Sequence, residues 1–361
     1  MRLKNQSRLT IVGAAVLVMS LVGCAGTTEE AEVVAQPEAT ADAAAVAVDP
    51  CEALSGKTLS LIVTFAPGGG YDTFARLLAP ELAKAVNADI IVENKDGAGG
   101  LLAINSLIQS GRTDGTEFAI MNGVGTVASV LAEAEGAAFS LDDLSYIGRI
   151  GADDAVLVTS ANSEYKTFAD VLSKGEFSFG STGPGSSNYV WPSLLIEAFD
   201  LEASGSKLIS GFKGSGDITL AVLQGDVSGY SATSDSIQSS IDSGEIISLL
   251  GLSNVATKAS GDAPLIGDLD LTERQRSLLD SQVVASRLGR VLVGPGNMDS
   301  GALQCLRDGL AKVMDDDAFT SEAAAAGRAF SYIPGEVVQE EIINNLTGLP
   351  EDFLAVLKAA Y

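Results

Sequence analysis

The residues of this chain that could do chemistry are concentrated in four segments rich in glycine and hydroxyl side chains, at 66–72, 122–126, 181–188 and 211–216. Each segment follows a β-rich run and precedes a helical pattern. Glycine lets a ligand approach the backbone closely, and the first N–H groups of a helix carry partial positive charge. One such segment alone is typical of an ordinary tight turn, but four together predict a cleft in which neutral donors bind an anion.

Several classes of site are excluded. The sequence has no histidine, so it cannot form a Ser-His-Asp triad, a histidine-ligated zinc site or a histidine general base. The G-x-x-x-x-G-K-[ST] motif is missing, and the glycines at 68–70 lack the G-x-G-x-x-G register because residue 73 is Thr. The acidic pairs at 142–143 and 153–154 could do acid–base work, but solvated or helix-capping carboxylates are the favoured interpretation. The acidic run at 315–317 lacks the spacing of a calcium loop. We therefore predict no metal site and no cofactor.

The chain is strongly acidic, with a formal net charge of −25. Removing residues 1–23, which contain three basic and no acidic residues, leaves 19 basic and 47 acidic residues, or −28. This charge argues against nucleic acids and anionic membrane surfaces as partners. An anionic ligand would then be held by local N–H dipoles and not by the net charge.

The N-terminus has the pattern of an export signal. Three basic residues within the first eight precede an apolar run at 9–22, which is shorter than the about 20 residues that a membrane span needs. The run ends in Leu21-Val22-Gly23-Cys24, which resembles a bacterial lipobox. We predict that 1–23 is a lipoprotein signal peptide and that Cys24 is acylated, which would place the protein outside the cytoplasm, anchored to the cell membrane by lipid. The alternative is an ordinary secretory signal with an incidental cysteine.

Residues 24–56 are predicted to form a flexible tether. The segment is rich in alanine and acidic residues and cannot bury enough apolar surface to offset its ordering entropy. The rest of the chain is long enough for two domains. Once Cys24 is acylated, Cys51 and Cys305 remain, and in an exported protein such a pair favours a disulfide. The alternative is two buried, unpaired thiols.

Strands and helices alternate from residue 58 onward. Helical patterns separate β-rich runs at 58–65, 89–93 and 117–121, and this order predicts a mostly parallel sheet covered by helices. In the first helix, Asp72 is placed to cap the start and Pro80 to kink or divide the helix. The pattern restarts at 155, and the helix expected at 300–314 packs back on the first lobe. We therefore expect a discontinuous first lobe, 57–152 plus 285–361, around a second lobe at 153–284.

The loops resemble those of the TctC/Bug family, the extracytoplasmic receptors of tripartite tricarboxylate transporters. The resemblance covers about 57–345, essentially the whole globular part. The matching segments are Phe65-Ala-Pro-Gly-Gly-Gly-Tyr-Asp-Thr-Phe-Ala-Arg76, Val92-Glu-Asn-Lys-Asp-Gly-Ala-Gly-Gly100, Asp114-Gly-Thr116, Gly180-Ser-Thr-Gly-Pro-Gly-Ser186 and Phe212-Lys-Gly-Ser-Gly216.

The resemblance implies an α/β periplasmic-binding-protein fold of the second type, in which two lobes with mostly parallel sheets close by a hinge on a carboxylated solute. The implied partners are a small carboxylate, of the di- or tricarboxylate class, and the membrane subunits of a transporter, with the receptor itself a monomer and no enzyme. The implied binding residues of the first lobe are Pro67, Gly68, Gly69, Tyr71, Asp72, Asn122 and Thr126. Those of the second lobe are Ser181, Gly185, Ser186, Ser187, Lys213, Gly214 and Ser215.

The sequence departs from the family pattern at two positions. Ser187-Asn188-Tyr189 stands where a histidine commonly follows the second-lobe Gly-Ser, and Phe212 replaces the usual tyrosine before Lys-Gly. Trp191 could form a wall of the cleft, although a packing role is at least as consistent with its position. Two other functions stay open: a receptor that delivers its ligand to a signalling partner, and a carboxylate-processing enzyme on the same fold.

Overall fold

The computed structural model describes residues 49–346 and 348–361. The expected signal peptide, Cys24 and most of the expected tether lie outside these residues. The end of the tether, at 49–56, is folded: it forms turns, and Leu54 is completely buried. The prediction that the tether extends to residue 56 is therefore wrong, because Leu54 and Cys51 belong to the hydrophobic cluster of the first lobe.

The first sheet has the strand order β11-β4-β10-β3-β1-β2. Its strands are β1 (Thr58–Val63), β2 (Asp89–Asn94), β3 (Glu117–Asn122), β4 (Leu144–Gly151), β10 (Arg290–Pro295) and β11 (Ile333–Pro334). β1 pairs with β2 and β3 in parallel, as expected from the β-α-β-α-β order. β10 is antiparallel to both of its neighbours, β3 and β4.

The second sheet has the order β7-β6-β8-β5-β9. Its strands are β5 (Ala155–Ser160), β6 (Ser178–Ser181), β7 (Lys207–Ser210), β8 (Gly229–Thr233) and β9 (Ile246–Gly251). β6 is parallel to β7 and β8, whereas β5 is antiparallel to β8 and β9. The predicted two-lobe α/β fold is confirmed, but both sheets are mixed and not mostly parallel.

The direction of the crossing segments explains the antiparallel pairs. β4 leads the chain toward the second lobe and β10 leads it back, so the two strands must run in opposite directions, with Arg290 paired to Gly151. The two segments that pass between the lobes also contact each other directly: the N–H of Asp153 donates to the carbonyl of Ser286 at 3.2 Å. Gly289 has φ +48°, and an added Cβ would lie 2.1 Å from the carbonyl oxygen of Gly151. Only glycine fits where the crossings pass each other.

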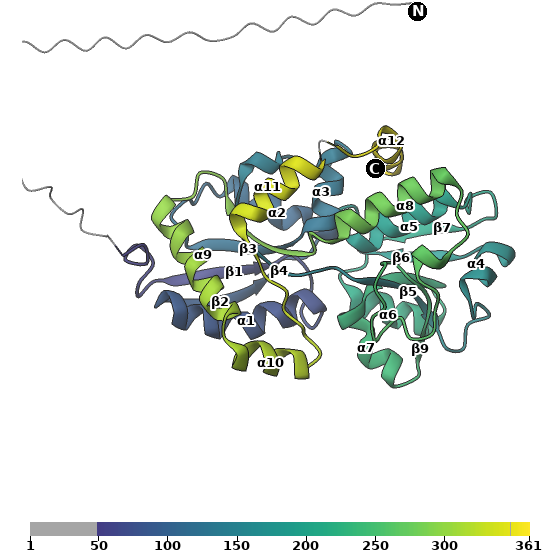
Figure 1. The fold of residues 1–361 in the computed structure, drawn as a ribbon, viewed down its shortest axis with the longest axis horizontal. Coiled ribbons are helices and arrows are strands. Elements are labelled where there is room, and N and C mark those ends of the chain that lie inside the picture. Colours follow the sequence, from purple (N-terminus) through teal and green to yellow (C-terminus); the bar gives the residue numbers. More distant parts are fainter. Residues whose placement is uncertain (1–48, 347) are drawn as a thin grey trace, which may run out of the picture. The chain divides into compact units, whose positions relative to one another are not determined.

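Helices cover both sheets (Figure 1). Those of the first lobe are α1 (Gly70–Val86), α2 (Leu101–Gln109), α3 (Gly123–Leu131), α9 (Ser300–Met314), α10 (Asp317–Ala325) and α11 (Gly335–Leu346). The second lobe contributes α4 (Phe168–Lys174), α5 (Ser187–Ala198), α6 (Ser215–Gln224), α7 (Ser234–Asp242) and α8 (Glu273–Ser286). α1 is a single helix through Pro80, and its N-cap is Gly69, with Asp72 in the first turn. Asp72 is therefore not the N-cap residue, although its Oδ2 accepts from the N–H of Gly68 at 2.9 Å, and Pro80 does not divide the helix.

The last helix, α12 (Glu351–Ala360), is placed differently from the expected lobe assignment of 285–361. Its buried residues Phe353, Val356 and Leu357 belong to the same cluster as Trp191 and Leu194 of α5. Trp191 is completely buried in this cluster and has a packing role. The last helix therefore packs across both lobes, against α5 and α8 of the second lobe and α3 of the first.

Cys51 and Cys305 form a disulfide with a Cα–Cα distance of 4.8 Å and a sequence separation of 254. Cys51 precedes β1, and Cys305 lies on α9 within the first-lobe cluster. The bridge therefore joins the start of the described chain to the segment that returns from the second lobe. Among the described residues, no helix is long and apolar enough to cross a membrane.

Candidate functional site

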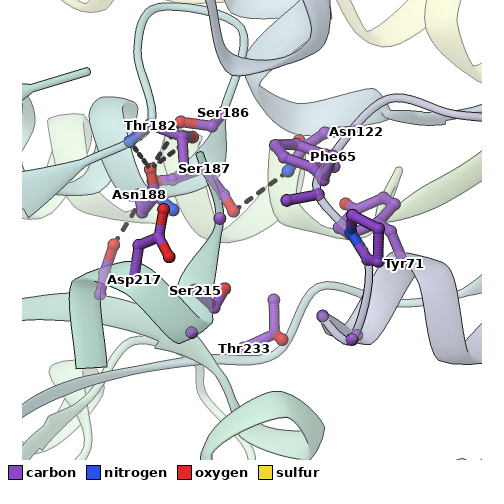
Figure 2. A pocket seen from close by; sticks show the side chains of 18 residues that line it. Phe65, Tyr71, Asn122, Thr182, Ser186, Ser187, Asn188, Ser215, Asp217 and Thr233 are labelled. Carbon is purple, nitrogen blue, oxygen red and sulfur yellow. Dashed lines mark hydrogen bonds between the residues drawn. The ribbon is translucent and has the colours of Figure 1, made fainter. Parts of the chain in front are cut away.

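A cavity of about 160 Å³ lies between the loops at the carboxyl ends of the strands (Figure 2). It has the position at which open α/β sheets bind ligands. Its lining from the first lobe is Phe65, Ala66, Pro67, Gly68, Gly69, Gly70, Tyr71 and Asn122. Its lining from the second lobe is Thr182, Ser186, Ser187, Asn188, Gly214, Ser215, Gly216, Asp217, Ser231 and Thr233.

The N-terminus of α1 forms the first-lobe wall. Gly69 is the N-cap residue, and Gly70 and Tyr71 follow it in the first turn. The first N–H groups of a helix have no partner within the helix, so those of Gly70 and Tyr71 are available to a ligand in the cavity. The carboxylate of Asp72 faces away from the cavity: it accepts from Arg76 at 3.0 Å and from Asn94 at 2.9 Å. A carboxylate of the chain itself therefore does not occupy this wall.

Two further helices begin at the second-lobe wall. α6 starts after its N-cap Gly214, and α5 starts after its N-cap Ser186. The early residues of both helices line the cavity: Ser215 and Gly216 from α6, and Ser187 and Asn188 from α5. Three helix N-termini, from two lobes, therefore converge on one small cavity. Their partial positive charges favour a bound anion there.

The donors of Ser186 are used within the second lobe. Its N–H donates to the carbonyl of Gly183 at 3.1 Å, and its hydroxyl lies 2.7 Å from the same carbonyl and 2.6 Å from Oδ1 of Asn188. Oδ1 of Asn188 also accepts from the N–H of Thr182 at 3.0 Å. Oδ1 of Asn188 thus holds the loop at 182–186 together.

Asn122 joins the lobes beside the cavity. Its Oδ1 accepts from the N–H of Gly125 at 2.7 Å and so caps α3. Its Nδ2 lies 3.2 Å from the hydroxyl oxygen of Ser187 and 3.3 Å from Oδ2 of Asp153. Figure 2 shows the bond between Asn122 and Ser187 crossing the cavity edge.

The lobes are closed around the cavity. The N–H of Gly185 donates to the carbonyl of Ala98 at 3.2 Å, and that of Ala66 donates to the carbonyl of Lys213 at 3.4 Å. The backbones approach so closely that a Cβ on Gly125 would lie 2.3 Å from the nitrogen of Ser186. The glycines of these loops therefore allow closure as well as tight turns.

Five residues predicted for the site do not line the cavity: Asp72, Thr126, Ser181, Gly185 and Lys213. Thr126 is buried within α3, and the hydroxyl of Ser181 accepts from the N–H of Gly183 at 3.0 Å. Gly185 packs against the backbone of 98–99, and Lys213 contributes its carbonyl to the lobe contact. These residues support the loops or the closed contact. The other predicted residues, Pro67, Gly68, Gly69, Tyr71, Asn122, Ser186, Ser187, Gly214 and Ser215, lie together on the lining.

Sequence reasoning missed part of the lining. Ser231 and Thr233 lie two residues apart on β8. In the sequence they are marked only by a short run of small polar residues at the end of a strand. Asn188 stands out in the sequence only as part of a departure from the family pattern. Asp217 stands in the first turn of α6, where an acidic residue is usually explained by helix capping.

A buried charged cluster lies behind Tyr71. Arg290 is 2% exposed, and its guanidinium stacks on the rings of Tyr71 and Phe74 and pairs with Asp235 of the second lobe at 2.7 Å. Burial raises the pKa of Asp153, and the charge of Arg290 only partly offsets this. Burial alone would lower the pKa of Arg290, but Asp235, Tyr71 and Asp153 outweigh it and raise the pKa. The guanidinium therefore stays charged in the closed form.

The acidic pair at 142–143 has a structural role, because Asp143 accepts from the N–H of Ser140 at 2.7 Å in a capping box. No group of three or more metal-ligating side chains occurs among the described residues.

Comparison with known proteins agrees with the family resemblance of the loop sequences. BugT of Bordetella pertussis is 27% identical over 223 residues, which are 60% of this chain and 67% of BugT. A UPF0065 protein of Agrobacterium vitis is 30% identical over 146 residues, so the chain spans only 41% of that relative's length. The fold is similar to that of the periplasmic binding protein BugD, with a TM-score of 0.68, 18% identity and coverage of 84% of this chain and 97% of BugD.

Two further solved structures share the fold. MatC from Rhodopseudomonas palustris, with bound malate, has a TM-score of 0.69 at 18% identity and covers 83% of this chain and 99% of its own. A second R. palustris protein, with adipate, has a TM-score of 0.69 at 16% identity and covers 84% and 97%. The family model described as tripartite tricarboxylate transporter family receptor matches residues 74–327. The resemblance of the loops is thereby confirmed: the chain belongs to the TctC family of tripartite tricarboxylate transporter receptors.

Proposed function

We propose that this protein captures a small carboxylate outside the cytoplasm and delivers it to the membrane subunits of a tripartite transporter. The observation that carries the proposal is the convergence of the N-termini of α1, α5 and α6 on one cavity. An anion in this cavity would be held by neutral N–H groups of both lobes, so its binding would favour the closed form. Family membership and the malate and adipate of two structural neighbours support a ligand of the di- or tricarboxylate class.

The proposal places one carboxylate of the ligand at the N-terminus of α1, beside Gly69, Gly70 and Tyr71. Gly69 offers a direct test, because a Cβ added there meets only the carbonyl oxygen of Ala66 at 3.7 Å. Aspartate is favoured at an N-cap, so Gly69→Asp should fold at least as stably as wild type while its own carboxylate occupies the N–H groups of α1. A fixed charge about 4 Å from the ligand's carboxylate costs about 4 kcal/mol at an effective dielectric constant of about 20.

We therefore expect Gly69→Asp to raise the Kd of the ligand at least about 100-fold. Gly69→Ala adds a methyl group and no acceptor, so it should change the Kd by less than about fivefold. The ligand is first found by a thermal-shift screen of mono-, di- and tricarboxylates, because a ligand at 100 times its Kd adds about 2.7 kcal/mol of stability. If none of the acids stabilises the folded protein, the proposed function is wrong. Wild-type affinity in Gly69→Asp would contradict the placement of the carboxylate.

Binding is proposed to occur without turnover and in a monomer. Proton NMR of the protein with the selected acid should show the acid unchanged after prolonged incubation, and sedimentation should give the mass of one chain. A new product signal would favour an enzyme instead.

The lipid anchor is part of the proposal and rests on the Leu21-Val22-Gly23-Cys24 pattern. Cys24→Ser should move the protein from the membrane fraction to the soluble fraction, because acylation needs the thiol. A variant that stays in the membrane fraction to the same extent as wild type would contradict the anchor.

A further inference from the structure

Helix α12 lies against both lobes (Figure 1). It packs against α3 of the first lobe and against α5 and α8 of the second. Its apolar face belongs to one hydrophobic cluster with Ala128 of α3 and with Ala132, the C-cap of that helix. A change in the angle between the lobes would therefore alter contacts that α12 makes.

Tyr361, which follows α12 directly, reaches a loop of the second lobe. Its hydroxyl donates to the carbonyl of Pro184 at 2.8 Å. Its ring packs against that of Tyr189 on α5, with the ring centroids 5.0 Å apart. The hydroxyl of Tyr189 in turn donates to the carbonyl of Ala360. One tyrosine thus ties the end of α12 to α5, and the other ties it to the loop.

Pro184 is the middle residue of the loop at 182–186, which serves both the cavity and the contact between the lobes. Both ends of this loop line the cavity. Its middle meets the first lobe so closely that a Cβ on Gly99 would lie 2.5 Å from the carbonyl oxygen of Gly183 and 2.7 Å from the nitrogen of Gly185. A shift of the Pro184 carbonyl would therefore displace the cavity wall and the closed contact together.

The carbonyl of Pro184 has two possible donors, but only Tyr361 is committed to it. The other donor, the hydroxyl of Ser129 on α3, lies 3.0 Å from this carbonyl and 2.8 Å from the carbonyl of Gly125 in its own helix. A serine hydroxyl has a single proton, so it cannot serve both carbonyls fully. Opening of the lobes would also draw α3 away from the loop. Tyr361 stays beside the loop, because Tyr189 ties it to α5 of the same lobe.

We propose that Tyr361 is a positioning residue for ligand capture: its hydrogen bond to Pro184 keeps the loop at 182–186 in the conformation that lines the cavity and meets the first lobe. The inference rests on the proposed function, which places the ligand in this cavity. Without the bond, the loop samples other conformations and binding must order it again. Only the fraction of molecules with the competent loop binds, so the apparent Kd rises by the inverse of that fraction.

The test compares Tyr361→Phe with the matched control Tyr189→Phe. Each variant loses one hydroxyl of the same ring pair, but only the first loses the bond to the loop. Hydrogen exchange at 179–190, followed by mass spectrometry on the ligand-free protein, reports on the loop. Calorimetry with L-malate, adipate and citrate gives the Kd of each acid that binds. Denaturant titration checks that both variants are folded and equally stable.

We expect Tyr361→Phe to raise the Kd about threefold to tenfold, within the range of one neutral hydrogen bond, and to speed exchange at 179–190. Tyr189→Phe should change the Kd by less than about twofold and leave this exchange as in wild type.

A wild-type Kd or wild-type exchange in Tyr361→Phe overturns the inference. An equal effect of the two variants also overturns it, because both hydroxyls would then act only by docking α12. If wild type binds none of the three acids, the wider screen described above decides separately whether the proposed function fails. Exchange at 179–190 in the ligand-free protein then tests the inference by itself, and an unchanged rate in Tyr361→Phe overturns it.

Discussion

Gly125 meets the second lobe closely without being part of the cavity lining, so changing it should separate lobe closure from ligand contact. The residue lies in the first turn of α3, and a Cβ added to it would lie 2.3 Å from the nitrogen of Ser186 and 2.4 Å from the carbonyl carbon of Gly185 in the other lobe. Contacts of this kind are normally 3.4 Å or longer. Gly125→Ala therefore requires the lobes to move apart by about 1 Å at this point, the difference between ordinary contact and the built distance.

The magnitude follows from where the cost falls. Overpacking by one methyl group costs about 1–3 kcal/mol, and here only the closed form bears it, so the Kd of the ligand should rise between about fivefold and about 150-fold. The open form has no such clash and gains helix propensity, since alanine is favoured over glycine in a helix by up to about 1 kcal/mol. Gly125→Ala should thus be at least as stable as wild type without ligand.

Calorimetry with the acid selected in the screen gives the Kd, and small-angle scattering gives the radius of gyration with and without that acid. Wild type should contract on binding and Gly125→Ala should contract less. Gly301→Ala is the control, because Gly301 lies in α9 and its added Cβ comes no closer than 3.3 Å to a neighbour, Oδ1 of Asp299. Wild-type affinity together with full contraction in Gly125→Ala would refute the role of the 183–186 contact in closure.

Three further predictions concern the stability of the fold. Replacing Cys51 and Cys305 by serine should lower the free energy of unfolding by about 2–5 kcal/mol, measured by denaturant titration, because the bridge closes a long loop; an unchanged midpoint would contradict this. Burial raises the pKa of Asp153 above its ordinary value near 3.8. The free energy of unfolding therefore falls as the pH rises from about 3.8 through the raised pKa, because the ionised carboxylate is less favourable in the folded than in the unfolded state. Asp153→Asn should therefore gain stability relative to wild type more at pH 8 than at pH 5, and the opposite order would show that the charged form is favoured. Arg290→Met should leave Asp235 unpaired in the closed form and cost at least about 3 kcal/mol of closed-state stability, seen as a larger radius of gyration with ligand, whereas a contraction equal to that of wild type would exclude the ion pair as a closing contact.

The loops at the strand ends could be found from the sequence because their conformation depends on local residues. A glycine-rich turn between a β-rich run and a helical pattern fixes a helix N-terminus at that point, as at Gly69 before α1 and Gly214 before α6. The bounds of α9 and the position of β10 follow from the same local patterning. The spacing of the motifs was therefore sufficient to indicate the family and the end of the sheet at which the cavity lies.

The sequence did not indicate how the hydrogen bonds of the loops are distributed. Ser186 has the donors expected of a binding residue, but the carbonyl of Gly183 and Oδ1 of Asn188 take them up. Asp72 and Asp217 occupy equivalent positions in their motifs, yet only Asp72 forms an ion pair, with Arg76, and accepts a hydrogen bond from Asn94. Which donors and charges remain for a ligand depends on neighbours that the fold brings together, and a single sequence does not show these neighbours.

The sequence by itself determined the alternation of strands and helices and the glycine-rich loops, because each depends on residues that are close along the chain. Only the tertiary structure decided that β10 enters its sheet antiparallel, that α12 packs against helices of both lobes, and that Gly125 meets Ser186 across the lobes. These features depend on the direction in which the chain crosses between lobes and on contacts between residues far apart in sequence. The charge that faces the cavity from Asp217 is of the same kind, because it is set by the absence of a cationic neighbour among the described residues and not by the residue type alone.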